Sequence, residues 1–128
     1  MTALRRLVGY ALAVPVAFAA GLRVCRLERR LPFDRLVDEL RRASRLPSAA
    51  ADPIALGRVV GRLAPALPPW GMGRCLKRSL LLVHLWARCG LQPRLHLGFV
   101  GERRGHAWVT GGPFAPSSEE QAAEVAAL

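Results

Sequence analysis

Residues 74–90 read RCLKRSLLLVHLWARCG and form the most regular stretch of the chain. Apolar residues recur there at helical spacing, and Gly90 follows in the place where many helices end on a left-handed residue. A Pro/Gly-rich segment, residues 65–73 (PALPPWGMG), comes directly before and cannot continue a helix. The pattern therefore predicts a helix over residues 74–89 with Cys75 at its start.

Downstream of this helix the apolar residues change to an alternating pattern. Residues 94–100 (RLHLGFV) and 106–110 (HAWVT) predict two antiparallel strands joined by a turn at residues 101–105. The tail, residues 117–128, has serine at a capping position with glutamate after it and predicts a short helix. Helices followed by antiparallel strands predict an α+β fold.

Upstream, the sequence favours helices. Three stretches show helical spacing: residues 7–22 with a continuation to residue 30, residues 33–46, and residues 54–64. Asp52 followed by Pro53 is typical of an N-cap and the first helical position, which fixes the start of the third stretch. We divide the chain into an N-terminal helical segment, residues 1–46, and a core, residues 47–128.

Residues 7–22 (LVGYALAVPVAFAAGL) carry no charge. The run resembles the start of a secretory signal or a membrane span, but it is shorter than the ~20 residues that cross a hydrocarbon core. Pro15 also lies in its middle, and the helical pattern continues through charged residues to Arg30. We expect a helix that packs on the domain or lies at a membrane surface.

The composition excludes several classes of protein. The chain has 128 residues, of which 52% are apolar, so it is not intrinsically disordered. Three cysteines do not make a disulfide scaffold. The net charge of +10 invites a polyanion as partner, but the arginines occur singly or in pairs without interleaved aromatics, so we expect no nucleic acid.

Cys75 and His106 are the candidates for chemistry. The free N–H groups at a helix start stabilise a thiolate, and Arg74 and Lys77 add positive charge nearby in the sequence. His106 begins a strand just after a turn, where it can serve as the base for the thiol. His96 is a weaker candidate for that base. A lone cysteine at a helix start is more often a small buried apolar residue, which is the alternative for Cys75.

Two other uses of cysteine and histidine are disfavoured. His84 lies on the predicted nucleophile helix, about 13 Å along the axis from Cys75, which is too far for a base. The spacings of Cys75, Cys89, His96 and His106 match no tetrahedral zinc framework. We therefore expect no metal site and no cofactor.

Three segments together resemble a known family: residues 75–90, residues 95–100, and the Gly-His-Ala-Trp-Val sequence at 105–109. They are similar to the C-terminal domain of the lasso-peptide biosynthesis B protein, the microcin-processing type, in its stand-alone peptidase form. That family consists of transglutaminase-like cysteine peptidases. The resemblance covers residues 55–112 and implies a transglutaminase-like, papain-like fold in which a nucleophile helix packs on a small antiparallel sheet.

The resemblance also implies roles for individual residues. Cys75 is the implied nucleophile and His106 the implied base. Arg78 and Ser79 are implied to brace the site, and Trp108 to support the histidine strand. The alternative for Arg78 is a solvated or structurally paired guanidinium, and the alternative for Trp108 is an ordinary core residue.

The chain departs from the family pattern at the third catalytic position. The family has an Asp about a dozen residues after the histidine, whereas this chain has no Asp after Asp52. Ser118 occupies the corresponding place and Glu119 follows it, while Thr110 stands where the family usually has Glu. Three outcomes remain open: Glu119 substitutes for the Asp, a backbone carbonyl orients the histidine, or activity is weak or lost.

The function implied by the resemblance is removal of the leader from a lasso precursor peptide through an acyl-enzyme. The implied partners are that precursor, a separate leader-recognition protein of winged-helix type, and the lasso cyclase. We expect a cytoplasmic location, with contact to a membrane surface as an addition. The alternatives are a catalytically impaired transglutaminase-like scaffold and a basic protein that binds a membrane surface.

Overall fold

The computed structural model of the chain describes residues 3–100, 104–114 and 124–128. The helices are α1 (Ala3–Glu28), α2 (Phe33–Arg41), α3 (Pro53–Leu63) and α4 (Arg74–Arg88), with a 3-10 turn at Ala64–Ala66. The strands are β1 (Arg94–Val100), β2 (Arg104–Thr110) and β3 (Glu124–Ala127). The predicted α+β fold is confirmed.

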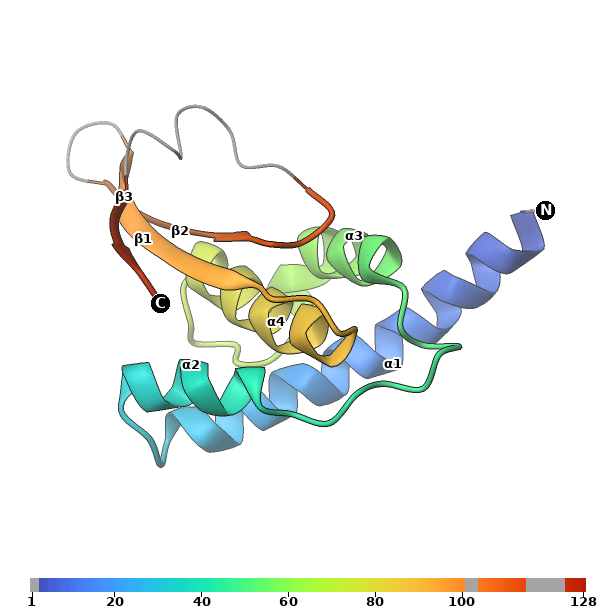
Figure 1. The fold of residues 1–128 in the computed structure, drawn as a ribbon, viewed down its shortest axis with the longest axis horizontal. Helices are drawn as coiled ribbons and strands as arrows, with labels where there is room; N and C mark the ends of the chain where they lie inside the picture. Colours follow the sequence, from blue (N-terminus) through green and yellow to red (C-terminus); the bar gives the residue numbers. More distant parts are fainter. Residues whose placement is uncertain (1–2, 101–103, 115–123) are drawn as a thin grey trace.

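Helix α4 lies at the centre of the molecule (Figure 1). It has α1 and α2 on one side, the sheet on the other and α3 alongside, and it contacts all of them. Every residue from Ser79 to Trp86 is buried. A helix that is apolar nearly all round must be covered on every side, which is why this stretch becomes the central helix.

The three strands form one antiparallel sheet in the order β2-β1-β3. The register places His96 opposite Trp108 and Gly98 opposite His106. Because side chains alternate along a strand, His106 and Trp108 share one face of the sheet. Ala107, between them, belongs to the other face and to the hydrophobic core.

The C-terminal tail corrects one expectation. Residues 124–127 form strand β3 rather than part of a helix, while residues 117–123 of the predicted helix lie outside the described residues. Leu128 and Leu95 exchange two backbone hydrogen bonds of 2.7 and 2.9 Å, and Arg41 donates to the Leu128 carbonyl. A short helix is marginal in isolation, whereas the edge of β1 offers a row of backbone partners.

Two helix ends show why local signals succeed or fail. The Asp52 carboxylate accepts hydrogen bonds from the N–H groups of Ile54 and Ala55 at 3.1 and 3.2 Å, so the predicted N-cap of α3 is confirmed. Helix α2 ends at Arg41, five residues before its predicted end at residue 46. The chain leaves the helix there because Leu46 donates to the carbonyl of Arg88 at the end of α4.

Helix α1 runs unbroken through Pro15. Its buried face consists of small residues and one valine: Ala13, Ala17, Ala20, Gly21 and Val24. A Cβ on Gly21 would stand 2.4 Å from the Pro68 carbonyl oxygen, so glycine is required for this close approach. The expected boundary between residues 46 and 47 stays a prediction.

Candidate active site

The structure brings Cys75 and His106 together. The sulfur of Cys75 lies 3.5 Å from Nδ1 of His106, although the two residues are 31 positions apart in the sequence. Both side chains are partly buried. Cys75 comes from the first turn of α4 and His106 from strand β2, which packs against α4. This distance permits direct proton transfer between thiol and imidazole.

The start of α4 has no side-chain cap. The N-cap residue is Gly73, and the first backbone bond of the helix runs from Lys77 N–H to the Gly73 carbonyl at 2.9 Å. The N–H groups of Arg74, Cys75 and Leu76 therefore have no intrahelical acceptor. They point out of the helix start as donors next to the sulfur, a position where they could stabilise the oxyanion of a carbonyl attacked by a thiolate.

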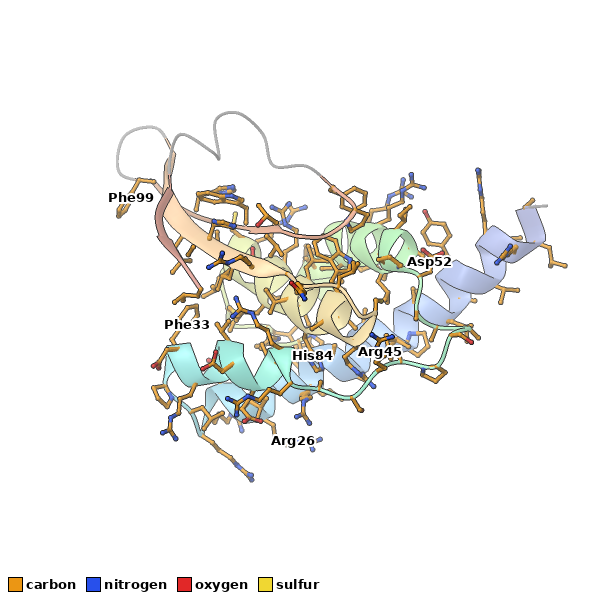
Figure 2. The ribbon with its side chains drawn as sticks, viewed as in Figure 1. Arg26, Phe33, Arg45, Asp52, His84 and Phe99 are labelled. Carbon is orange, nitrogen blue, oxygen red and sulfur yellow. The ribbon has the colours of Figure 1, made fainter. Side chains whose placement is uncertain are left out.

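An apolar cavity opens on this pair of residues. It has a volume of about 410 Å³, and Cys75 and His106 both line it. The remaining walls are apolar or small: Leu76, Leu97, Gly98, Phe99, Gly105 and Ala107. Phe99 is 58% exposed and stands at the end of β1, as labelled in Figure 2. The cavity is suited to an apolar side chain placed next to the Cys75 sulfur.

Trp108 lies under the histidine. Its ring stacks on His106 at 5.6 Å between centroids and on His96 at 5.5 Å, and its side chain is buried. Thr110 accepts or donates a 2.6 Å hydrogen bond at Nε2 of His96, so this second imidazole is held by its own strand pair. The contact with Trp108 restricts how the His106 ring can turn.

Arg78 and Ser79 take different positions. Ser79 is buried one turn after Cys75, and its hydroxyl has no hydrogen-bond partner among the described residues. Arg78 is partly buried and makes no hydrogen bond or ion pair with another described residue. Both therefore contribute packing rather than polar contacts to the part of the site that the structure describes.

Lys77 does not face the sulfur as its sequence position suggested. Its side chain is 3% exposed, and Nζ donates to the carbonyls of Ala64 and Leu67 at 2.9 and 2.8 Å. It joins α4 to the segment that follows α3. Nζ thus satisfies two buried carbonyl groups, so Lys77 stabilises the fold rather than the charge of the Cys75 sulfur.

Glu119 and Ser118 lie outside the described residues. The assignment of Glu119 as the group that orients His106 stays a prediction. Within the described part of the chain, no group of three or more His, Cys, Asp or Glu residues is placed to hold a metal ion.

Two other titratable groups on α4 lie away from this site. His84 is buried with Nδ1 3.0 Å from the Leu40 carbonyl, and burial lowers the pKa of its imidazole to about 4. Burial also raises the pKa of the Cys89 thiol, and the charge of Asp52 adds to the effect. The buried His84 imidazole and the partly buried Cys89 thiol are therefore neutral at neutral pH.

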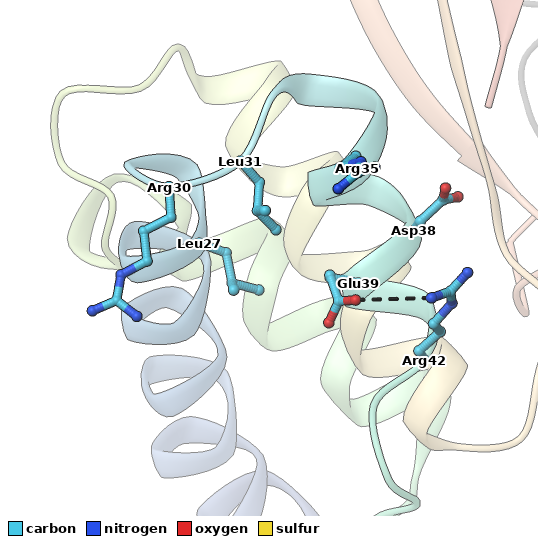
Figure 3. A pocket seen from close by; sticks show the side chains of 7 residues that line it. All are labelled: Leu27, Arg30, Leu31, Arg35, Asp38, Glu39 and Arg42. Carbon is cyan, nitrogen blue, oxygen red and sulfur yellow. Dashed lines mark ion pairs between the residues drawn. The ribbon is translucent and has the colours of Figure 1, made fainter.

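A second cavity, of about 580 Å³, lies between the end of α1 and helix α2 (Figure 3). Leu27 and Leu31 contribute its apolar surface, and charged residues of α2 surround them. Arg42 and Glu39 form an exposed pair there at 3.9 Å, a contact of little energetic weight. Neither Cys75 nor His106 lines this cavity.

The comparisons with known proteins give one family. A family model described as the transglutaminase-like superfamily matches residues 15–127. No curated protein and no solved structure matches the chain. The match spans most of the chain, so this protein belongs to the transglutaminase-like superfamily, whose members include cysteine peptidases and acyltransferases.

Sequence reasoning missed the cavity walls. The alternation of residues 94–100 puts Leu97 and Phe99 on one side of a strand, a pattern that by itself indicates only a core-facing side. An aromatic residue at the last positions of such a strand, beside a glycine, was the available signal for an open pocket. The bond between His96 and Thr110 was also missed, since it depends on the strand register.

Proposed function

We infer that this protein is a cysteine peptidase that removes the leader of a lasso precursor peptide. The 3.5 Å contact between the Cys75 sulfur and His106 Nδ1 carries the proposal. Membership of the transglutaminase-like superfamily supports the thiol chemistry. The Cys-helix and Gly-His-Ala-Trp-Val segments supply the resemblance to the lasso-peptide peptidases.

The geometry supports a two-step reaction. His106 Nδ1 takes the proton of the Cys75 thiol, and the sulfur forms a bond to the scissile carbonyl carbon. The N–H groups at the start of α4 stabilise the resulting oxyanion. When the intermediate collapses, the C–N bond breaks and the imidazolium returns its proton to the leaving amine.

Hydrolysis then regenerates the enzyme. A water molecule gives a proton to His106 and adds its oxygen to the thioester carbon. The C–S bond breaks, and the leader is released with a new carboxylate while Cys75 recovers its proton. The amine product is the free N-terminus of the core peptide, which a separate lasso cyclase would use for ring closure.

The remaining partners are part of the same proposal. A separate leader-recognition protein of winged-helix type would present the precursor, and the net charge of +10 would speed association with an acidic leader or an acidic partner surface. The reaction needs no cofactor in this scheme. We place it in the cytoplasm, where precursor, recognition protein and cyclase would meet.

The test compares wild type with Cys75→Ser and His106→Asn on the precursor with its recognition protein, followed by mass spectrometry. We expect the wild type alone to separate leader from core, and a thioester of Cys75 to accumulate at early times. Equal cleavage by Cys75→Ser would overturn the mechanism. If Cys75 is alkylated rapidly by iodoacetamide but the precursor stays intact, the thiol chemistry stands and the substrate assignment fails.

A second candidate follows from the missing Asp after Asp52. In that case the chain is a transglutaminase-like scaffold without catalysis. Alkylation distinguishes the two, since the scaffold predicts that Cys75 reacts with iodoacetamide at the rate of an ordinary thiol.

A further inference from the structure

The outer face of α1 is apolar along most of its length. Between residues 7 and 22 every exposed residue of the helix is apolar, the largest being Leu7, Val8, Val14, Phe18 and Leu22. Their spacing puts them on one side of the helix, opposite the face that packs on α3 and α4. We call these five residues the α1 stripe; it is about 22 Å long.

Trp70 extends the stripe from a different part of the chain. It is 61% exposed and lies 6.3 Å, between ring centroids, from Phe18. Its Nε1–H donates to the Ala66 carbonyl at 3.1 Å, so the one polar atom of the side chain is already bonded within the protein. The exposed apolar surface thus crosses from α1 to the loop before α4.

Positive charge marks both ends of the stripe. Arg5 and Arg6 are exposed before it, and Arg23 and Arg26 are exposed after it. Helix α1 contains no acidic residue before Glu28. Arginines with long apolar stems can hold their charged groups at the level of lipid headgroups while neighbouring apolar side chains enter the layer below.

A protein partner fits this surface less well than a lipid surface. Protein interfaces of stable size contain several direct hydrogen bonds. The α1 stripe offers neither donor nor acceptor side chains, and the Trp70 N–H is already in use. An exposed apolar surface without polar contacts, bordered by cations, matches anionic lipid.

Helix α1 is long and apolar enough to cross a membrane, and 28% of its most apolar 18-residue stretch is buried inside the protein. Crossing a bilayer would require α1 to leave α3 and α4, because its opposite face is packed against them. Lying in the plane of the interface keeps those contacts. In Figure 1 the first turns of α1 also extend beyond the other elements, which leaves them accessible to a flat surface.

We propose that the α1 stripe and Trp70 dock this protein on an anionic lipid surface, with α1 parallel to that surface. The proposal is independent of the peptidase assignment, since none of these residues lines the cavity at Cys75.

Co-sedimentation of the full chain with vesicles tests the proposal. We expect the wild type to bind vesicles of phosphatidylcholine and phosphatidylglycerol, and the variant Leu7→Gln/Val14→Gln/Phe18→Gln to bind at least about tenfold more weakly. Arg5→Gln/Arg6→Gln should weaken binding to these vesicles about tenfold and leave binding to pure phosphatidylcholine unchanged. Phe99→Gln is the matched control: it removes an even more exposed phenylalanine away from α1, and vesicle binding should not change.

Tryptophan emission provides a second measurement. Trp86 and Trp108 are buried, so a blue shift on adding vesicles reports Trp70, and Trp70→Phe should abolish the shift. We expect the triple variant to fold, because all three replaced side chains are exposed. A circular dichroism melt checks this.

Four outcomes would overturn the proposal. They are no binding to anionic vesicles, unchanged binding by the triple variant, retention of the protein in carbonate-washed membranes, and self-association without lipid that the triple variant abolishes. The third outcome would indicate a span, and the fourth a second copy of the chain as occupant. Cys75→Ser should bind vesicles as the wild type does, so a failure of the peptidase proposal and a failure of the lipid proposal can be told apart.

Discussion

The two ends of α4 each have a cysteine, and the two thiols have different surroundings. Cys75 stands at the N-terminal end, beside unbonded N–H groups, an imidazole and an open cavity. Cys89 caps the C-terminal end, where the helix presents carbonyl groups and burial raises the pKa of the thiol. Helix polarity and neighbours, rather than the residue type, decide which sulfur can act as a nucleophile.

The largest effect should come from removing each sulfur in turn. Cys75→Ala should lower kcat for precursor cleavage by at least about a thousandfold, because it removes the sulfur proposed to form the acyl-enzyme. Cys89→Ala should leave kcat within about threefold, since that thiol touches no part of the cavity. Cleavage assays on both variants measure the two values of kcat. A large loss of kcat in Cys89→Ala would contradict the distinction between the two thiols.

The free energy of unfolding should depend on pH through His84, which lies in the buried middle of α4, away from Cys75 at its start. His84 titrates near pH 6.5 when unfolded, whereas burial lowers its native pKa to about 4, so the unfolded state binds more protons between these values. Between pH 7.5 and pH 5 this histidine should therefore cost about 2 kcal/mol of stability. The carbonyl of Leu40 and the cations of Arg23 and Arg88 surround the imidazole.

Urea unfolding at both pH values measures this loss. The variant His84→Asn keeps a donor for the Leu40 carbonyl and lacks the titrating ring, so its stability should change less over the same range. An unchanged pH dependence in this variant would show that other groups are responsible.

The start of α4 can be tested without touching Cys75 or His106. Gly73 has φ −56° and open space around its Cα, so Gly73→Asp is sterically allowed. The new carboxylate should cap the helix and raise stability by about 0.3 kcal/mol, because glycine is already a fair N-cap residue. It should also lower activity about tenfold or more, because it occupies the N–H donors needed by the oxyanion. Thermal melts and cleavage rates should thus move in opposite directions.

The smallest effect is expected at Ser79. Its hydroxyl is buried without a partner among the described residues, so Ser79→Ala removes an unsatisfied polar atom. Stability should change by less than about 0.5 kcal/mol and kcat by less than about threefold. A large loss of kcat at unchanged stability would show that the hydroxyl is used in catalysis.

Local sequence signals predicted the elements that carry the site. The helix over residues 74–89, its Gly90 end with φ +88°, and the two strands all follow from periodicity and capping within a few residues of the chain. The closeness of Cys75 to His106 was expected from the resemblance to transglutaminase-like peptidases, because local signals alone do not say which strand packs against a helix start.

Other features depended on partners distant in the sequence. Strand β3 forms because β1 offers an unpaired edge, and α2 stops early because Leu46 pairs with the end of α4. The buried position of Lys77 follows from two carbonyls in the turn after α3. None of these partners is visible from local composition. Propensity alone therefore predicts a helix in the C-terminal tail, a longer α2 and an exposed charge at Lys77.

The buried Lys77 has a practical consequence, because it is the only lysine in the chain. Lys77 is 3% exposed and its Nζ is bonded to two carbonyls, so an amine-reactive dye applied to the folded protein should leave this side chain unlabelled. Labelling of Lys77 would then report, without mutation, that the contact between α4 and the turn after α3 has opened.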